Sequence, residues 1–365
     1  MPDPVLIIAE AGVNHDGSVV DACRMIDAAA EAGADVVKFQ TFVPEAVLTA
    51  RAMKAAYQET NTGAAGSQLD MVRTLALGRD EHRVLAERCE RRGVRFMSTA
   101  FDMESLDFLS GFEMPATKIP SGDLTWGAML LAAARAGRPL LVSTGMASLA
   151  EVREALAVIA FGLTREGDPA GPDELEEAFA AGQAALRDRV VLLHCTTEYP
   201  APLGAVNLRA MTTMAETFGL RVGYSDHTLG WTVAVGAVAR GACVVEKHFT
   251  LRRDRVGPDH AASLEPEELA ALVRAIREME AALGRPEKQA APAELGNVAI
   301  ARRSLVAARP IRAGEVLTAA HLTAKRPADG LSPMRQWRLI GTPAARDYAP
   351  DEAIEPPPGG QGKML

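Results

Sequence analysis

Gly223-Tyr224-Ser225-Asp226-His227 and Val244-Val245-Glu246-Lys247-His248 are two short runs that begin with apolar residues and each end in a histidine. Runs of this length and composition are typical of strands buried in a parallel sheet. If the two strands are neighbours, their ends meet at one edge of the sheet, and His227 and His248 point at one place. The stretch from residue 223 to residue 248 therefore predicts both a parallel sheet and a candidate site.

Similar apolar runs alternate with helical patterns from residue 5 to residue 284. Eight of them occur, at residues 5–9, 36–39, 94–97, 117–119, 140–143, 190–194, 221–223 and 243–246. Five helical stretches end in a glycine, which can take the left-handed conformation of a helix C-cap: Gly33, Gly93, Gly137, Gly219 and Gly241. Eight strand–helix units predict a (β/α)8 TIM barrel over residues 1–284.

The composition changes after the barrel. Residues 285–300 are rich in proline, alanine and charge, which predicts a linker. Residues 301–356 contain two units of similar spacing, 308–317 and 345–354, and predict a small module of about 55 residues, near the lower limit of independent stability. Residues 357–365 are predicted to be a disordered tail.

Two insertions lengthen the barrel. Residues 44–77 follow the second strand, and a loop that follows a barrel strand lies on the active-site face. We expect this segment to form a lid or an oligomer contact. Residues 161–187 precede the sixth strand, carry a run of glycine and proline, and are expected to be a solvated decoration.

Composition narrows the class of protein. The chain has 365 residues, of which 48% are hydrophobic and 24% charged, and a net charge of −8 that argues against nucleic acid as a partner. No run is long enough to span a membrane and no signal peptide is recognisable, so a cytoplasmic protein without membrane contact is expected. The four cysteines lack metal-site or redox spacing and are expected to be reduced.

The histidine pair suggests a metal. Imidazole is a good ligand for divalent ions, and two such ligands with open positions left over describe a catalytic site better than a closed structural one. A single histidine after a strand is more often a hydrogen-bonded rim residue. The pairing of His227 with His248 is what raises the metal interpretation to the level of a hypothesis.

Two lysines at strand ends suggest an anion site. Lys38 and Lys118 each lie within a predicted buried strand, where an ammonium group is costly without an anionic partner. Hydroxyl groups follow neighbouring strands at Ser98, Thr99, Ser121, Thr197 and Ser225. Ammonium and hydroxyl groups that converge would bind a phosphate or a carboxylate; the alternative is that both lysines are solvated.

Three other chemistries compete with this interpretation. A Schiff-base aldolase would use a desolvated lysine among Lys38, Lys118 and Lys247, but it leaves the histidine pair without a role. Ser225, Asp226 and His227 cannot form a hydrolase triad, since three adjacent residues do not converge in the required relay. A nucleotide-binding protein would need a glycine-rich phosphate motif, which is absent from the sequence.

Several long motifs resemble those of the sialic acid synthases. They occupy residues 8–17, 34–42, 118–123, 194–200, 223–228, 246–250 and 257–260. Residues 301–356 resemble the antifreeze-like (SAF) domain of those enzymes. The resemblance extends over nearly the whole chain and adds the SAF domain to the barrel as the expected fold.

The resemblance implies that phosphoenolpyruvate condenses with an N-acetylated hexosamine. The first expectation for the sugar is N-acetylmannosamine, which would give N-acetylneuraminate and phosphate. The alternative is 2,4-diacetamido-2,4,6-trideoxymannose, because Thr197-Glu198-Tyr199 also resembles legionaminic acid synthases. Asp123 and Thr197 depart from the best-known bacterial branch and leave the sugar open.

The resemblance also implies a role for single residues. His227 and His248 would hold Mn²⁺ or Mg²⁺, and Glu10 would handle a proton or water. The residues expected to bind phosphoenolpyruvate are Lys38, Thr99, Lys118, Ser121 and Ser225, and those expected to face the sugar are Asp123, Thr197, Tyr199 and Asp259. Arg326 would reach the sugar in a partner subunit's barrel, which implies a domain-swapped homodimer.

Overall fold

The computed structural model describes residues 3–62 and 67–355, so the predicted tail lies outside the described residues. The chain divides into two compact units, Met1–Gly284 and Arg285–Leu365. The first unit contains the predicted barrel and the candidate site. None of the helices in the described ranges is long and apolar enough to cross a membrane. All four cysteines are free thiols, as expected.

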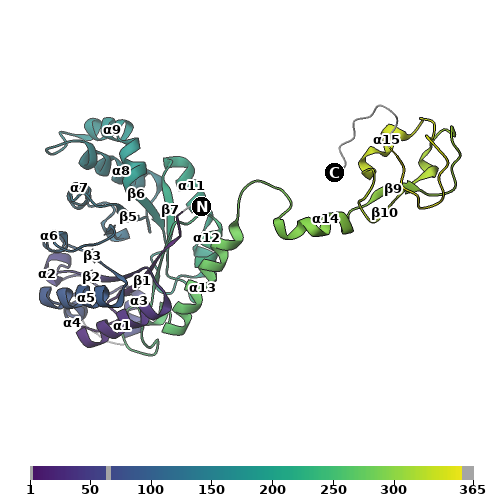
Figure 1. The fold of residues 1–365 in the computed structure, drawn as a ribbon. Helices are drawn as coiled ribbons and strands as arrows, with labels where there is room; N and C mark the ends of the chain where they lie inside the picture. The colour runs from purple at the N-terminus through teal and green to yellow at the C-terminus, as the bar shows by residue number, and fades with distance from the viewer. Residues whose placement is uncertain (1–2, 63–66, 356–365) are drawn as a thin grey trace. The chain divides into compact units, whose positions relative to one another are not determined.

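Eight parallel strands form the barrel predicted from the apolar runs (Figure 1). They are β1 (Leu6–Gly12), β2 (Val36–Thr41), β3 (Arg95–Ala100), β4 (Thr117–Ile119), β5 (Leu140–Ser143), β6 (Val190–His194), β7 (Arg221–Asp226) and β8 (Val244–His248). Hydrogen-bonded neighbours follow the order β3-β2-β1-β8-β7-β6-β5-β4, and β3 also lies next to β4. The TIM-barrel prediction is confirmed.

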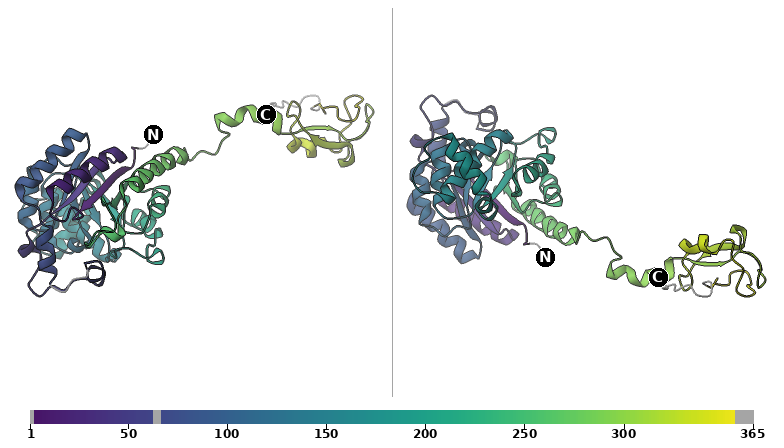
Figure 2. Two further views of the ribbon diagram at one scale, coloured as in Figure 1. Left: turned by 90° about the horizontal axis from the view of Figure 1, so that it is seen from below. Right: turned by 90° about the horizontal axis from the view of Figure 1, so that it is seen from above.

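Helices surround these strands in every view (Figure 1, Figure 2). The main ones are α1 (Val19–Ala32), α5 (Arg79–Arg92), α6 (Met103–Ser110), α7 (Gly127–Arg135), α8 (Leu149–Thr164), α11 (Arg209–Phe218), α12 (Thr232–Ala239) and α13 (Pro266–Leu283). The five glycines predicted as C-caps all have positive φ, between 64° and 95°. Glycine relieves the strain of that conformation and lets the chain turn directly into the next strand.

Five strands extend further than their apolar runs. β1, β2, β3, β7 and β8 continue through polar residues at their C-terminal ends, where the parallel ladder pairs Glu10 with Lys38 and Asp226 with Lys247. Polar residues can continue a buried strand when each finds a partner. The strand ends beyond the apolar runs therefore carry part of the site.

Gly223 in the middle of β7 is a test of barrel packing. A Cβ atom there would lie 2.6 Å from Leu193 Cδ2 and 2.7 Å from the carbonyl oxygen of Val244, and the latter cannot move without shifting β8. Gly223→Ala is expected to lower the free energy of unfolding by about 1–3 kcal/mol, measured by urea denaturation. Gly127→Ala, where a Cβ meets nothing within 4 Å, is the control and should not destabilise the fold.

The segment after β2 folds into three short helices, α2 (Pro44–Val47), α3 (Ala56–Thr62) and α4 (Gln68–Leu75). Asn61 of α3 donates a hydrogen bond to the carbonyl of Pro258, in the loop after β8. Leu69 and Leu75 of α4 are buried. This segment lies at the strand ends that carry the site, where a lid would be.

The insertion before β6 is more than a solvated decoration. It contains α9 (Pro172–Ala181) and α10 (Gln183–Arg189), which pack on α8. Ala178 and Leu186 are fully buried against the barrel helices. The prediction was wrong because a few apolar residues next to a strongly acidic stretch give little indication that their side chains are buried.

The C-terminal unit has its own core. β9 (Ser304–Ala307) pairs with β10 (Leu322–Lys325) in an antiparallel sheet. The two units of similar spacing meet through the bridge between Ile311 and Tyr348, and both side chains are buried. Helix α14 (Leu295–Ala301) occupies the end of the stretch predicted as a linker, and α15 (Gln336–Leu339) lies near the end of the unit.

Candidate active site

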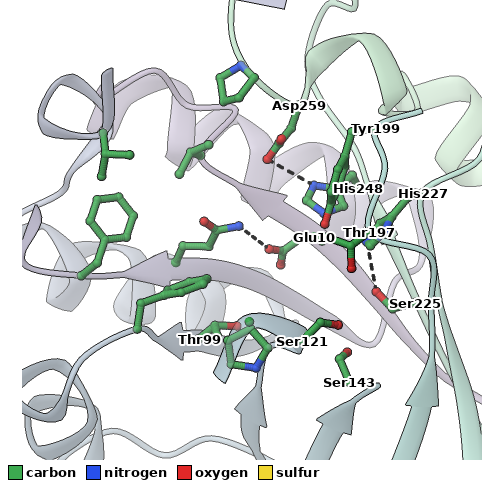
Figure 3. A pocket seen from close by; sticks show the side chains of 18 of the residues that line it. Glu10, Thr99, Ser121, Ser143, Thr197, Tyr199, Ser225, His227, His248 and Asp259 are labelled. Carbon is green, nitrogen blue, oxygen red and sulfur yellow. Dashed lines mark hydrogen bonds and ion pairs between the residues drawn. The ribbon is translucent and has the colours of Figure 1, made fainter. Parts of the chain in front are cut away.

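A cavity of about 380 Å³ lies at the C-terminal ends of the barrel strands (Figure 3). Most of the residues predicted for the site line it: Glu10, Lys38, Thr99, Lys118, Ser121, Thr197, Tyr199, Ser225, His227, His248 and Asp259. They come from seven of the eight strands or from the loops directly after them, since parallel strands bring these ends to one face. Asp123 does not line the cavity, and Arg326 belongs to the C-terminal unit.

Two lysines and two glutamates form an ion-pair network in the cavity. Lys38 Nζ lies 2.7 Å from Glu10 and 3.5 Å from Glu246, and donates a 2.9 Å hydrogen bond to Thr99 Oγ1. Lys118 Nζ lies 3.4 Å from Glu246. All four charged side chains are at most 5% exposed. The anionic partners that the buried lysines required are thus present in the chain itself.

This network shifts the pKa values of Glu10, Lys38 and Glu246. Burial raises the pKa of Glu10 to about 7, although the Lys38 ammonium acts in the opposite direction. Burial alone would lower the pKa of Lys38, but the carboxylates of Glu10 and Glu246 outweigh it and raise this pKa. Burial would raise the pKa of Glu246, but Lys118 and Lys38 outweigh it and lower this pKa. Glu246 therefore stays an anion, and Glu10 can exchange a proton near neutral pH.

The two histidines lie together, with ring centroids 5.5 Å apart. His227 Nδ1 lies 2.6 Å from the carbonyl oxygen of Thr196 and donates a hydrogen bond to it, which leaves a lone pair on Nε2, 3.4 Å from Ser225 Oγ. Burial lowers the pKa of His227 to about 4 and that of His248 well below its usual value. Both imidazoles are therefore neutral at neutral pH, the form that binds a metal.

The donor set fits a catalytic divalent ion. His248 Nδ1 is buried and has no hydrogen-bond partner among residues 3–62 and 67–355, and Asp259 Oδ2 lies 3.8 Å from it. In the same ranges no group of three or more histidine, cysteine or acidic side chains could hold an ion. Two neutral imidazoles would therefore leave coordination positions open for water or substrate, as catalytic sites require.

An aromatic stack connects the histidines to the segment after β2. The centroid of the Tyr199 ring lies 4.1 Å from that of the His227 ring and 5.1 Å from that of the Tyr57 ring on α3. Asp259, on the loop after β8, faces the same part of the cavity (Figure 3), and burial raises its pKa to about 6. The segment after β2 therefore forms one wall of the cavity, as expected of a lid.

Asp123 and Arg326 are the two remaining predicted residues. Asp123 ends a short 3-10 turn after β4, and Ser121 and Gly122 of that turn line the cavity while Asp123 does not. Burial raises the pKa of Asp123 to about 6, and Lys118 opposes this. Arg326 is exposed just after β10 in the C-terminal unit, and its contact with a sugar in a partner subunit stays a prediction.

Three cavity residues were not predicted as site residues. Glu246 joins both lysines, Gln40 donates a 3.2 Å hydrogen bond to Glu10, and Tyr57 extends the aromatic stack. Glu246 and Gln40 could have been found from strand alternation, because each has the same parity as a predicted residue of its strand. Tyr57 lies in an insertion, and no sequence signal places it at the site.

Comparisons with known proteins agree with this geometry. A model of the NeuB family matches residues 25–288, and a model of the SAF domain matches residues 302–357. The N,N'-diacetyllegionaminic acid synthase of Campylobacter jejuni is 44% identical, over 96% of this chain and 98% of that one. The synthase of the same name from Legionella pneumophila is 41% identical, over 92% and 89%.

A solved structure supports the same assignment. The N-acetylneuraminic acid synthetase of Leptospira borgpetersenii is 31% identical, over 81% of this chain and 90% of that one, with a TM-score of 0.66. The matched regions extend over both units of the chain. The chain belongs to the NeuB family and carries a C-terminal SAF domain.

Proposed function

We propose that this enzyme condenses phosphoenolpyruvate with 2,4-diacetamido-2,4,6-trideoxymannose to give N,N'-diacetyllegionaminic acid and phosphate. The observation that carries the choice of sugar is the 44% identity, over nearly the full length of both chains, with a synthase named for that product. Identity to the sialic acid synthetase is lower, at 31%. The comparisons therefore favour the alternative sugar over N-acetylmannosamine, our first expectation.

The lysine side of the cavity suits the phosphoenolpyruvate anion. Lys38 and Lys118 supply two ammonium groups, which also pair with Glu10 and Glu246, and Thr99, Ser121 and Ser225 supply hydroxyl groups. Charge-assisted hydrogen bonds of this kind bind phosphate and carboxylate groups strongly. Ser121 Oγ already accepts a 3.0 Å hydrogen bond from the backbone nitrogen of Gly145, which fixes its position.

Glu10 is suited to moving a proton. The carbon–carbon bond joins C3 of phosphoenolpyruvate to the aldehyde carbon of the sugar, and water then adds to C2 before phosphate leaves. Addition of water and loss of phosphate both require proton transfer. A buried carboxyl with a pKa of about 7 is matched to that task at neutral pH. Lys38, 2.7 Å away, holds Glu10 in place.

His227 and His248 would hold the divalent ion, Mn²⁺ or Mg²⁺, of this proposal. A bound ion at this point supplies Lewis-acid polarisation of the sugar aldehyde. The chain orients its ligands through the hydrogen bond from His227 to Thr196 and through the Tyr199 ring packed on His227.

The wall formed by the segment after β2 suits a deoxygenated, acetylated sugar. Apolar side chains of this segment line the cavity: Phe42, Val47, Leu48, Met71, Val72 and Leu75. Phe101, directly after β3, also lines it, with its ring centroid 6.2 Å from that of Phe42. A 2,4-diacetamido-2,4,6-trideoxy sugar presents three methyl groups, two from the acetamido groups and one at C6. N-acetylmannosamine presents one methyl group and a C6 hydroxyl, which an apolar wall binds less well.

The Schiff-base alternative is disfavoured for two of its three candidate lysines, Lys247 and Lys38. Such a nucleophile needs a lowered pKa and access to the substrate. Burial lowers the pKa of Lys247, but this residue does not line the cavity. Lys38 does line the cavity, but its neighbouring carboxylates raise its pKa.

A sugar comparison tests the proposal. With phosphoenolpyruvate and Mn²⁺, kcat/KM measured by phosphate release is expected to be about tenfold or more higher with 2,4-diacetamido-2,4,6-trideoxymannose than with N-acetylmannosamine. Mannose, which has no acetamido group, is the matched control and should give no release above background. An equal or higher value with N-acetylmannosamine would contradict the proposed sugar.

A further inference from the structure

Lys247 is a fully buried charge that does not line the cavity. It lies in β8 between Glu246 and His248, which both line the cavity, so strand alternation turns Lys247 to the opposite face of the strand. Its side chain is 1% exposed, and Nζ lies 3.0 Å from Oδ2 of Asp226, whose side chain has no exposure. This ion pair has no part in the proposed chemistry.

The ammonium of Lys247 holds both neighbours of His227. It contacts Asp226, which precedes His227, and donates a hydrogen bond to the carbonyl oxygen of Thr228, which follows it. The other oxygen of the Asp226 carboxylate accepts hydrogen bonds from the backbone nitrogen of Thr228 at 2.9 Å and from its hydroxyl at 2.8 Å. Residues 226–228 are thereby closed into a turn around one ammonium group.

The same ammonium belongs to the residue before His248. Asp226 and Lys247 are register partners in the β7–β8 ladder, and the preceding pair, Ser225 and Glu246, is joined by a 2.8 Å hydrogen bond on the cavity face. The ends of β7 and β8 are therefore joined on both faces, directly before His227 and His248. The separation of the two histidines depends on these two side-chain links.

Stability alone does not explain the Asp226–Lys247 pair. Desolvation makes a buried ion pair at best neutral relative to well-packed apolar side chains of the same volume. Such a pair holds the residues around it in a defined geometry. Metal ligands need this kind of support, because they bind an ion well only within a narrow range of positions.

We propose that Lys247 and Asp226 are positioning residues that set the separation and direction of His227 and His248 for a divalent ion. The inference rests on the proposed metal site. It assigns a function to the lysine of the Glu246-Lys247-His248 stretch other than catalysis: Lys247 acts through the backbone that carries the ligands and touches neither substrate nor ion.

Metal affinity tests the inference without recourse to turnover. In Lys247→Met, the dissociation constant for Mn²⁺, measured by isothermal titration of the folded protein, is expected to rise about 10- to 100-fold. Phosphoenolpyruvate affinity, measured without metal, should stay within about twofold, because Lys38 and Lys118 are untouched. A purely structural role would lower the thermal midpoint and leave both affinities of the folded protein unchanged.

Two further variants make the test decisive. Asp226→Asn/Lys247→Met removes both charges together, so no buried carboxylate is left unpaired, and it should fold and show the same loss of Mn²⁺ affinity. Arg277→Met breaks the 2.8 Å pair with Asp35 near the opposite ends of the strands, so it should cost stability but keep Mn²⁺ affinity. If the folded double variant binds Mn²⁺ as tightly as the wild-type protein, the positioning role of Lys247 and Asp226 is wrong, while the proposed metal site is unaffected. Absence of Mn²⁺ binding by the wild-type protein, or unchanged binding in His227→Ala, would overturn the metal site and this inference with it.

Discussion

Alanine in place of His227 is expected to lower kcat/KM for the condensation by about a thousandfold or more. The change removes one of two neutral imidazoles whose ring centroids lie 5.5 Å apart, and a single remaining imidazole would not retain the ion. Loss of Lewis-acid polarisation costs several kcal/mol of transition-state stabilisation, and each 1.4 kcal/mol is about a factor of ten in rate. Steady-state phosphate release, together with Mn²⁺ titration, measures both effects.

A second strand-end histidine provides the matched control. His194 ends β6, and its Nε2 lies 2.6 Å from the carbonyl oxygen of Val206, but it does not line the cavity. His194→Asn should therefore keep Mn²⁺ binding and most of the activity. Equal losses in the two variants would mean that the His227 effect arises from folding, and full activity of His227→Ala in chelator would exclude the metal.

Glutamine in place of Glu10 is expected to lower kcat by about 10²- to 10⁴-fold, the usual contribution of a general acid or base. Because burial raises the pKa of Glu10 to about 7, this group is protonated below neutral pH and charged above it. If the charged form accepts a proton from water, kcat/KM of the wild-type enzyme should rise with pH through about 7 and then level off. The Glu10→Gln variant should lack that rise.

The pH profile distinguishes catalysis from packing. A variant that is only misfolded would show lower activity with the same pH dependence as the wild-type enzyme. Glu113→Gln, at an exposed position, is the control and should keep both the rate and the profile. A rise through pH 7 that persists in Glu10→Gln would assign the titration to another group and remove Glu10 from the proton-transfer step.

The sequence predicted the barrel well because its information is local. Apolar runs of three to five residues locate the strands, and glycines at the C-caps locate the turns into them, without knowledge of any long-range contact. The strand ends were less accessible to this reasoning. There the ladder continues through polar residues such as Thr99 and Asp226, whose partners come from other strands.

The alternation of side chains along β8 would have improved the list of predicted site residues. Glu246 and His248 lie on one face and Lys247 on the other, so a site that includes His248 should include Glu246 and exclude Lys247. The segment after β2 is different: Tyr57 reaches the cavity only because three short helices fold back over the strand ends, and no periodicity in residues 44–77 indicates that path. The position of Asp123 could not be predicted for a similar reason. The 3-10 turn Ser121–Asp123 decides which side chains of residues 121–123 face the cavity.

The most direct test of the proposed activity is the stoichiometry of the reaction. The enzyme is incubated with phosphoenolpyruvate, 2,4-diacetamido-2,4,6-trideoxymannose and Mn²⁺, phosphate is followed by ³¹P NMR, and the sugar product is followed by mass spectrometry. One phosphate is expected for each molecule of a nine-carbon acid that contains both acetamido groups. Phosphate release without the nine-carbon product, or no consumption of phosphoenolpyruvate with this sugar, would contradict the account.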